Sequence, residues 1–397
     1  MTDKQKAWAV MMVTFLAGII TAINSFKVPP LIRVLMNELH VSMVAGGWLM
    51  SVSSATSLML AIPAAFLLVR LGPKITGLIA LSCTIIGSAI GAMAPNAAVM
   101  LLGRVIEGIS LGLLSVTAPT VISMWFRPKE LGLPMGLWTA WVPIGNVIMF
   151  NIAHPLLASF GWRAIWWFGA LLAFLAFVLF GLVVTVPQTA TRRERKPASS
   201  VGMRLFNPPS WCLALAFATF SFSLIGYNSW APTFLSDALH IEAATASFYA
   251  SLMFLAAIPA NVIAGWVLGH LKNRYALLPA SFLLMSFLIF WGFRLANVNM
   301  VAPYMIALGF ISNFIPTAAL AFAPETMPGP ELAGLAVAIL TVGANTGSLT
   351  GPPVLGAIFS QNHWSAGSTS LTIVAGIGTI VSWLVAKRLG AVHDSTR

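Results

Sequence analysis

The chain has 397 residues, of which 58% are hydrophobic and only 8% are charged. A soluble globular protein carries about 25% charged residues, so the surplus apolar surface of this chain must face lipid. The composition excludes a purely soluble enzyme or binding protein, and the formal net charge of +11 has to be explained within a membrane protein.

Twelve apolar runs follow one another along the chain, each close to the roughly 20 residues that a membrane-spanning helix needs. We predict spans at 7–30, 42–68, 75–93, 98–123, 133–158, 163–186, 209–233, 243–268, 275–294, 300–323, 332–358 and 367–387. The first run follows the basic segment Met1–Lys6, but no A-x-A-like cleavage site closes it, so we expect it to be retained as a helix. The pattern predicts an all-α membrane protein with about twelve transmembrane helices.

A polar connector at 187–208 separates the sixth run from the seventh. It contains the charged stretch Arg192–Lys196 and ends at Pro208, a composition that is typical of a flexible linker. We therefore predict an N-terminal six-helix bundle at 1–186 and a C-terminal six-helix bundle at 209–397.

The basic residues are distributed unequally between the two sides of the predicted spans. Of the 21 lysine and arginine residues, 16 fall on the side that holds both termini and four on the other side, while Arg104 lies inside a span. Because cytoplasmic loops carry the excess of lysine and arginine, we expect both termini in the cytoplasm and the protein in the plasma membrane, the inner membrane of a bacterium. This topology explains the net charge without a nucleic-acid partner.

Similar short segments recur in the two predicted bundles at a nearly constant distance. Leu39–Val41 reads L-H-V and matches Leu239–Ile241, which reads L-H-I, at an offset of 200 residues. Ala61–Ala64 matches Ala257–Ala260 at an offset of 196 residues. These ordered matches predict a six-plus-six duplication, an architecture of transporters that hold the solute at the interface of their repeats.

Three segments resemble motifs of the major facilitator superfamily. Arg104–Gly108 in the fourth span reads R-V-I-E-G, which resembles the family's R-x-x-[QE]-G signature. Val69–Lys74 resembles its G-x-x-x-D-R-x-G-R-[RK] loop, and Gly161–Arg163 reads G-W-R, which is also common in the family. The resemblance implies two pseudo-symmetric six-helix bundles around a central solute site, and secondary active transport by alternating access.

The loop resemblance is incomplete, because Ala65 stands where the family has glycine and Val69 where it has aspartate. The resemblance assigns the cytoplasmic gate loops of the two bundles to four basic residues, namely Arg70, Lys74, Lys272 and Arg274. The fifth span lacks the family's antiporter signature G-P-x-x-G-G and reads V-P-I-G-N at Val142–Asn146, which argues against a drug-efflux carrier but leaves it as an alternative. Within the family the chain loosely resembles cyanate and nitroimidazole porters and bacterial monocarboxylate carriers.

Ionisable residues inside the spans are functional candidates, because such a side chain at mid-membrane costs about 2.5–3.5 kcal/mol on insertion scales. Of the ten acidic residues, only Glu107 lies clearly within a span, and Arg104 three residues earlier shares its helix face. Two interpretations of this pair stay open. It is either a self-neutralising pair that fixes helix packing, or a proton relay in which a solute anion draws on Arg104 and frees Glu107 to titrate.

Lys27, in the outer third of the first span, also has two interpretations. Its ammonium group either snorkels to the membrane interface or faces the pathway as a cationic anchor for the solute. Together with Arg104 and Glu107 it gives the candidate pathway a net charge of +1, which favours an anionic solute because a buried anion needs a partner. We expect protons to drive transport through Glu107.

Polar and aromatic residues on further spans complete the candidate site. The resemblance places spans one, four, seven and ten around the central cavity, with five, eight and eleven beside it. Each of these residues alone also fits a helix–helix hydrogen bond or an interfacial anchor. The substrate-binding candidates besides Lys27 and Arg104 are Asn24, Trp138, Trp141, Asn146, Tyr227, Asn228, Tyr304, Asn313 and Asn345.

No residue pattern indicates a metal, a cofactor or catalysis. Cys83 and Cys212 belong to no CxxC or Cys/His cluster, and no HExxH, P-loop or nucleophile elbow occurs in the sequence. We expect a monomeric transporter of a small organic or inorganic anion in the lipid bilayer, without enzyme activity. A membrane enzyme and a non-transporting sensor with the same fold stay as alternatives.

Overall fold

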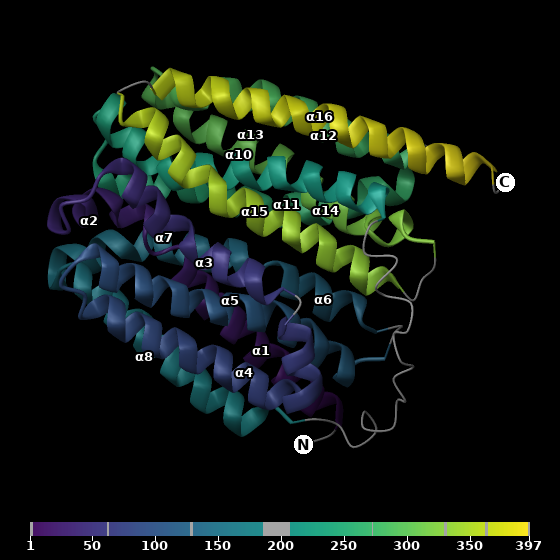
Figure 1. Ribbon diagram of the computed structural model, residues 1–397, viewed down its shortest axis with the longest axis horizontal. Coiled ribbons are helices and arrows are strands. Elements are labelled where there is room, and N and C mark those ends of the chain that lie inside the picture. The colour runs from purple at the N-terminus through teal and green to yellow at the C-terminus, as the bar shows by residue number, and fades with distance from the viewer. Residues whose placement is uncertain are drawn as a thin grey trace. The chain divides into compact units, whose positions relative to one another are not determined.

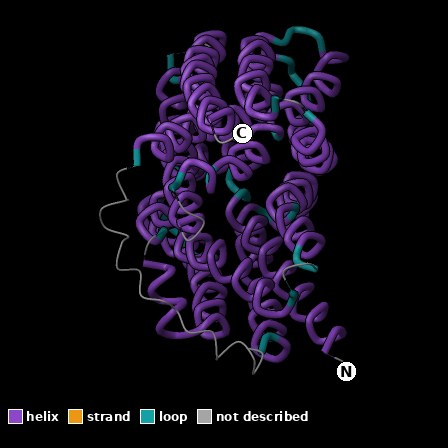
Figure 2. The backbone as a smooth tube through the Cα atoms, turned by 90° about the vertical axis from the view of Figure 1, so that its right-hand side faces the viewer, coloured by secondary structure: helices purple, strands orange, loops and turns teal. Residues whose placement is uncertain are grey.

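The structure is a computed structural model that describes residues 3–61, 63–127, 130–185, 207–271, 273–328, 332–361 and 364–395. Within these ranges the backbone forms helices joined by turns and bends, without a strand (Figure 2). The predicted connector at 187–208, except for its last two residues, and Lys272 of the gate loops fall outside the described ranges.

Twelve helical segments of the described chain are long and apolar enough to cross a membrane. They are Lys4–Glu38, Met43–Leu60, Phe66–Ala92, Ala97–Trp125, Gly132–Phe160, Trp162–Val183, Pro208–Ala238, Ala243–His270, Arg274–Arg294, Val298–Phe322, Ala333–Phe359 and Trp364–Ala391. The twelve segments follow the order of the twelve predicted spans, although Phe66–Ala92 begins inside the predicted span 42–68, so the prediction of an all-α protein with twelve spans is confirmed.

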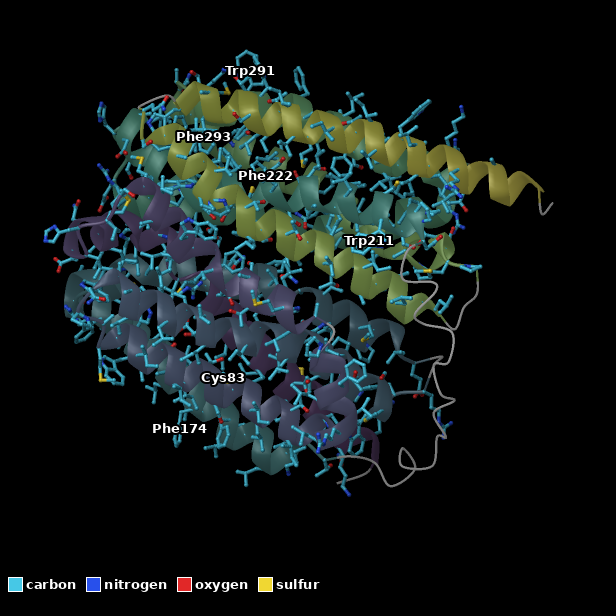
Figure 3. The ribbon with its side chains drawn as sticks, viewed as in Figure 1. Cys83, Phe174, Trp211, Phe222, Trp291 and Phe293 are labelled. Carbon is cyan, nitrogen blue, oxygen red and sulfur yellow. The ribbon has the colours of Figure 1, made fainter. Side chains whose placement is uncertain are left out.

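Large apolar side chains stay on the surface, as expected for a chain that lipid surrounds. Phe174, Trp211 and Trp291 are 52%, 40% and 48% exposed, whereas Phe293 is only 2% exposed (Figure 3). A water-soluble protein rarely leaves so many aromatic rings on its surface. The exposed rings therefore mark the lipid-facing sides of the helices.

The chain divides into two compact units, Met1–Val41 with Val52–Pro197, and Ser42–Ser51 with Ala198–Arg397. Residues 42–51, which the sequence assigns to the N-terminal bundle, pack in the second unit. There Gly47 lies so close to the backbone of Pro353 that an added Cβ would approach its Cα to 2.5 Å. The bundle limits 1–186 and 209–397 stay a prediction.

The first unit contains the helices of the first six spans, with the start of α3 belonging to the second unit. They are α1 (Asp3–Ser25), η1 (Pro29–Leu31), α2 (Ile32–Glu38), α3 (Met43–Leu60), α4 (Pro63–Ala92), α5 (Ala97–Trp125), α6 (Gly132–Thr139), α7 (Trp141–Phe160) and α8 (Trp162–Val183) (Figure 1). Helix α1 packs against α5, α7 and α8, and α4 packs against α5 and α8.

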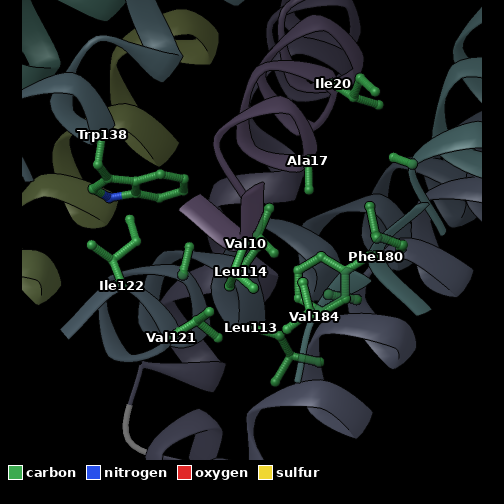
Figure 4. Packing of buried hydrophobic residues seen from close by; sticks show 14 of the residues in the cluster. Val10, Ala17, Ile20, Leu113, Leu114, Val121, Ile122, Trp138, Phe180 and Val184 are labelled. Atoms are coloured by element: carbon green, nitrogen blue, oxygen red, sulfur yellow. The ribbon is translucent and has the colours of Figure 1, made fainter. Parts of the chain in front are cut away.

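The apolar core of the first unit lies where α1 meets α5 and α8. Val10 and Ile20 of α1, Leu114 of α5 and Phe180 of α8 are at most 4% exposed and lie together (Figure 4). In lipid this association depends on close packing, because the surrounding acyl chains are as apolar as the side chains themselves. The fit of these side chains therefore holds α1 at a defined position beside α5.

The second unit contains the helices of the last six spans. They are α10 (Pro208–Ala238), α11 (Ala243–His270), η3 (Arg274–Ala276), α12 (Leu277–Trp291), η4 (Gly292–Arg294), η5 (Val298–Met300), α13 (Val301–Ser312), α14 (Phe314–Phe322), η6 (Pro324–Thr326), α15 (Ala333–Phe359) and α16 (Trp364–Ser395). Helix α10 packs along α15 and α16 (Figure 1). Gly351 of α15 lies so close to α10 that an added Cβ would be 2.6 Å from the carbonyl oxygen of Phe222.

Both repeats contain the same unusual turn. Among the described residues, the non-glycine residues with positive φ are His40 (52°) and His240 (55°). They occupy equivalent positions at the offset of 200 residues, and each lies one residue beyond the C-cap of a helix, the left-handed position that usually holds glycine. The common backbone geometry supports the duplication that the sequence predicts.

Candidate functional site

The site begins where α1 ends at Ser25. Residues 26–28 leave the helix just before Pro29 and Pro30, which lack the N–H groups that would continue its hydrogen bonds. A helix end leaves its last carbonyl groups without partners inside the helix. Two of these carbonyl oxygens, on Asn24 and Ser25, accept hydrogen bonds from the guanidinium of Arg104, at 2.8 Å from Nη1 and 2.7 Å from Nη2.

Glu107 lies one turn after Arg104 on α5 and bridges two cations. Its Oε2 lies 2.6 Å from Nη1 of Arg104, and its Oε1 lies 2.5 Å from Nζ of Lys27. The contact with Arg104 follows from their spacing of three residues on one helix face. The contact with Lys27 arises because the break after α1 turns this side chain toward α5.

Neutral polar groups complete the surroundings of Lys27. Its Nζ donates to the hydroxyl of Ser88 at 2.9 Å and to Oδ1 of Asn24 at 3.2 Å, so that with Glu107 all three ammonium protons have acceptors. The Ser88 hydroxyl lies 2.6 Å from Oε1 of Glu107. The ring of Trp166 lies 4.9 Å from the same ammonium group, which allows a cation–π interaction.

Lys27, Arg104 and Glu107 form a group that we call the charged cluster. Their exposed fractions are 1%, 0% and 3%, and no other lysine, arginine, histidine, aspartate or glutamate whose side chain the structure describes is as buried. Placing each ion in a medium of low dielectric costs several kcal/mol, which the pairing offsets. The cluster therefore depends most on Glu107, because removing this carboxylate leaves two buried cations without a counter-ion.

Glycines provide the space for this cluster between α4, α5 and α8. An added Cβ at Gly87 of α4 would lie 2.6 Å from the carbonyl oxygen of Gly103 and 2.7 Å from Cγ of Glu107. A Cβ at Gly91 would clash with the ring of Trp166, and one at Gly169 would clash with the amide of Asn24. Larger residues at these positions would push the polar side chains apart.

The structure gives a definite place to each charged candidate. Arg104 and Glu107 pair as their spacing predicts. Lys27 points inward to Glu107 and is fully buried, so its ammonium group does not snorkel to the interface. Sequence reasoning did not include Ser88 and Trp166, because nothing in the sequence distinguishes this serine or tryptophan from others in the spans.

The other candidates of the first unit lie on α6 and α7. Trp138 and Trp141 stack with ring centroids 5.2 Å apart and an interplanar angle of 18°. Trp138 is buried against Gly18 of α1. Asn146 is completely buried, and neither atom of its amide group has a hydrogen-bond partner among the described residues. An unpaired buried amide is costly, which keeps Asn146 among the candidates for binding a ligand.

In the second unit, Tyr227 and Tyr304 lie in an aromatic group. Their ring centroids are 6.2 Å apart, and the Tyr227 ring lies 4.9 Å from that of Phe293. The Tyr227 hydroxyl donates to the Sδ of Met305 at 3.7 Å, a weak acceptor. The Tyr304 hydroxyl donates to the carbonyl oxygen of Leu288 at 3.1 Å.

Three asparagines of the second unit differ in their surroundings. Asn228 is 1% exposed, and its amide has no hydrogen-bond partner among the described residues. Asn313 is half-buried at the break between α13 and α14 and donates to the carbonyl oxygen of Gly309 at 2.8 Å. Asn345 is half-buried on α15. Asn228 therefore resembles Asn146 in carrying a buried amide without a hydrogen-bond partner among the described residues.

The offset of 200 residues places Tyr227 at the position of Lys27 and Tyr304 at the position of Arg104. In the first unit these positions hold two cations that share Glu107, and in the second unit they hold two phenol rings in edge-on contact. The two repeats therefore preserve a contact between their first and fourth spans while replacing ionic chemistry with neutral chemistry.

Three gate-loop candidates, Arg70, Lys74 and Arg274, lie within the described ranges. Arg70 is exposed, and Lys74 is half-buried near the kink at Gly72. In the second unit, Nη2 of Arg274 lies 2.9 Å from Oε2 of Glu325, which also accepts a hydrogen bond from the Tyr275 hydroxyl at 2.9 Å. These bonds tie η3 to η6.

Comparison with known proteins gives a family for this fold. The model of the Major Facilitator Superfamily matches residues 14–242 and 213–396. The probable L-galactonate transporter of Escherichia coli K12 is 26% identical over 273 residues, which are 65% of this chain and 60% of that protein. The glycerol-3-phosphate transporter of Bacillus subtilis 168 is 25% identical over 299 residues, which are 66% of each protein.

The same fold occurs in solved structures. A crystal structure of a bacterial homologue of the human lysosomal transporter Spinster, in an inward-facing and occupied conformation, superposes with a TM-score of 0.77. The superposition covers 97% of this chain and 96% of that chain, at 16% sequence identity. At this identity the likeness shows the fold alone.

Proposed function

Because the chain belongs to the Major Facilitator Superfamily, we propose that it is a secondary active transporter that couples a small organic anion to protons by alternating access. The observation that carries this proposal is the charged cluster, in which one carboxylate, Glu107, is shared by two buried cations. A group of this kind can exchange one anion for another. We place the protein in the plasma (bacterial inner) membrane, with both termini in the cytoplasm.

Protonation of Glu107 is the proposed coupling step. A neutral carboxyl group no longer balances Lys27 and Arg104, and two buried cations without a counter-ion are unstable in a low-dielectric interior. An anionic solute restores the balance by taking the place of the Glu107 carboxylate. The same reasoning applies in reverse when the solute leaves, because the cations then favour an ionised Glu107 and release its proton.

The two cations have different parts in this exchange. Arg104 is held by backbone carbonyls of α1 at 2.8 and 2.7 Å, so it stays in place when Glu107 loses its charge. Lys27 is held through its ammonium group by side chains alone, those of Glu107, Ser88 and Asn24. We therefore propose Lys27 as the solute anchor and Arg104 as the group that fixes the end of α1.

The names of the relatives support a class of solute. L-galactonate and glycerol 3-phosphate, which name two of them, are small anions that carry hydroxyl groups. We propose the same class for this chain. The unpaired amide groups of Asn146 and Asn228 suit hydroxyl groups, since an amide both donates and accepts hydrogen bonds. The remaining candidates, Trp138, Trp141, Tyr227, Tyr304, Asn313 and Asn345, are proposed as further contacts of the solute.

Uptake of L-galactonate by proteoliposomes tests this function. We expect accumulation when the outside is made acidic and none after a protonophore is added. Glu107→Gln should abolish the dependence on the pH gradient because a carboxamide does not take up a proton, whereas Glu38→Gln, at an exposed carboxylate, should behave as wild type. Unchanged pH-dependent uptake by Glu107→Gln would contradict the proposal. An enzyme would convert the anion, and a sensor would neither convert nor accumulate it.

A further inference from the structure

The charged cluster contains two cations, Lys27 and Arg104, and one anion, Glu107. Among the lysine, arginine, histidine, aspartate and glutamate residues whose side chains the structure describes, no other is as buried. The net charge of the cluster is therefore +1 when Glu107 is ionised and +2 when Glu107 holds a proton.

The geometry provides one carboxylate position between the two cations. Glu107 fills it with both oxygens, since Oε1 lies 2.5 Å from Nζ of Lys27 and Oε2 lies 2.6 Å from Nη1 of Arg104. The other close bonds of the Arg104 guanidinium go to the carbonyl oxygens of Asn24 and Ser25 and to the hydroxyl of Ser53. The guanidinium is thus held by α1 and α3 as well as by Glu107.

We infer that the solute is a monovalent anion carried together with one proton, so that transport is electroneutral. This inference rests on the proposed function. The proton passes from water to a carboxylate oxygen of Glu107, and a solute carboxylate then accepts the hydrogen bonds that Lys27 and Ser88 make. No covalent bond to the solute forms. On the other side of the membrane the solute leaves, the proton returns to water, and Glu107 pairs again with both cations.

In this cycle the cluster has the same charge, +1, in the empty and in the loaded carrier. An uncompensated charge is costly in a low-dielectric interior. Because the empty and the loaded carrier bury the same net charge, both can change conformation. The form that is protonated but not loaded has a charge of +2 and is disfavoured, which prevents a leak of protons. A divalent anion would bring a second negative charge, and the described residues contain no third buried cation to pair with it.

Proteoliposomes containing the full chain and radiolabelled L-galactonate test the stoichiometry. At a constant inward proton gradient, valinomycin and potassium set the membrane potential to zero or to inside-negative. One proton per monovalent anion predicts the same accumulation at both settings, with a change of about tenfold per unit of pH gradient. Movement of one net charge would instead change accumulation about fifty-fold for a potential of about 100 mV. That result would overturn the inference and leave proton-driven transport intact.

Galactarate is a matched probe for the valence of the anion, because it carries a second carboxylate in place of the terminal hydroxymethyl group of galactonate. We expect it to inhibit uptake of labelled L-galactonate about tenfold more weakly than unlabelled L-galactonate does, since the second carboxylate lacks a buried partner. Inhibition of equal strength would overturn the monovalent assignment. Absence of any proton-driven uptake of L-galactonate would overturn the proposed function itself.

Glu107→Gln provides an independent readout. The variant cluster has a charge of +2 without the solute and +1 with it, so residual movement of L-galactonate carries one negative charge. We expect this residual uptake to ignore the pH gradient and to fall when the inside is made negative. Residual uptake that ignores the potential would overturn the inference. If this variant does not fold, the dependence of wild-type accumulation on the membrane potential still tests the inference.

Discussion

At the scale of single residues, the site depends on how each cation is held. The guanidinium of Arg104 bonds the carbonyl oxygens of Asn24 and Ser25, and it also pairs with Glu107. The ammonium group of Lys27 donates its hydrogen bonds to the side chains of Asn24, Ser88 and Glu107. A planar fork with several donors suits a fixed structural position, whereas a point charge on a flexible stem suits exchange of partners. The two cations should therefore respond differently to substitution.

Arg104→Gln should lower the free energy of unfolding by about 3–5 kcal/mol, because it breaks a buried ion pair from one side and also leaves the carbonyl oxygens of Asn24 and Ser25 without their donor. Lys27→Gln leaves Glu107 paired with Arg104, so we expect a smaller loss of about 1.5–3 kcal/mol. Thermal melts of the detergent-solubilised variants show which of the two substitutions is more destabilising. Lys27→Gln should also raise the KM for L-galactonate, and an unchanged KM would remove Lys27 from the solute site. Arg70→Gln, at an exposed arginine, is the control.

At the scale of helices and turns, the most informative elements are the helix ends. The break after α1 places Lys27 beside α5, and the turns at His40 and His240 put two L-residues in a left-handed conformation. Such a conformation costs roughly 1–2 kcal/mol for a residue with a Cβ. Glycine avoids that cost, although it loses more entropy on folding.

His40→Gly and His240→Gly should each raise the free energy of unfolding by about 0.5–1 kcal/mol, the difference between the relieved strain and the added entropy cost. His270→Gly is the matched control, because His270 is the last residue of α11 and lies outside the positive-φ region. It should lower the melting temperature. A fall of equal size in all three variants would show that the histidine side chains stabilise their turns.

Hydrophobic runs in the sequence predict the spans, and local spacing predicts the pair Arg104–Glu107, because both signals lie within one helix. The ion pair of Lys27 with Glu107 is not predictable in this way, since the partners are 80 residues apart and meet through packing of α1 on α5. The predicted fifth span is also interrupted at Ala140 between α6 and α7. Pro143 is the local signal for this break, because it has no N–H to donate to the carbonyl of Thr139, the last residue of α6.

At the scale of the whole molecule, the two repeats share a topology but differ in chemistry. The positions of Lys27 and Arg104 in the first unit correspond to Tyr227 and Tyr304 in the second. A duplication fixes which helices meet, and the later substitution of single residues decides whether the contact is ionic or neutral. Proton coupling should therefore reside in the first unit, since the described part of the second contains no lysine, arginine or carboxylate that is as buried.

The central claim is that an anionic solute and a proton bind together through Glu107. It is tested most directly by adding L-galactonate to the purified protein in a weakly buffered solution and recording the pH. Linkage requires that an anion which displaces the Glu107 carboxylate increases the affinity of this carboxylate for protons. We predict uptake of about one proton per anion bound by wild type, and none by Glu107→Gln. Binding of L-galactonate to wild type without uptake of protons would contradict the claim.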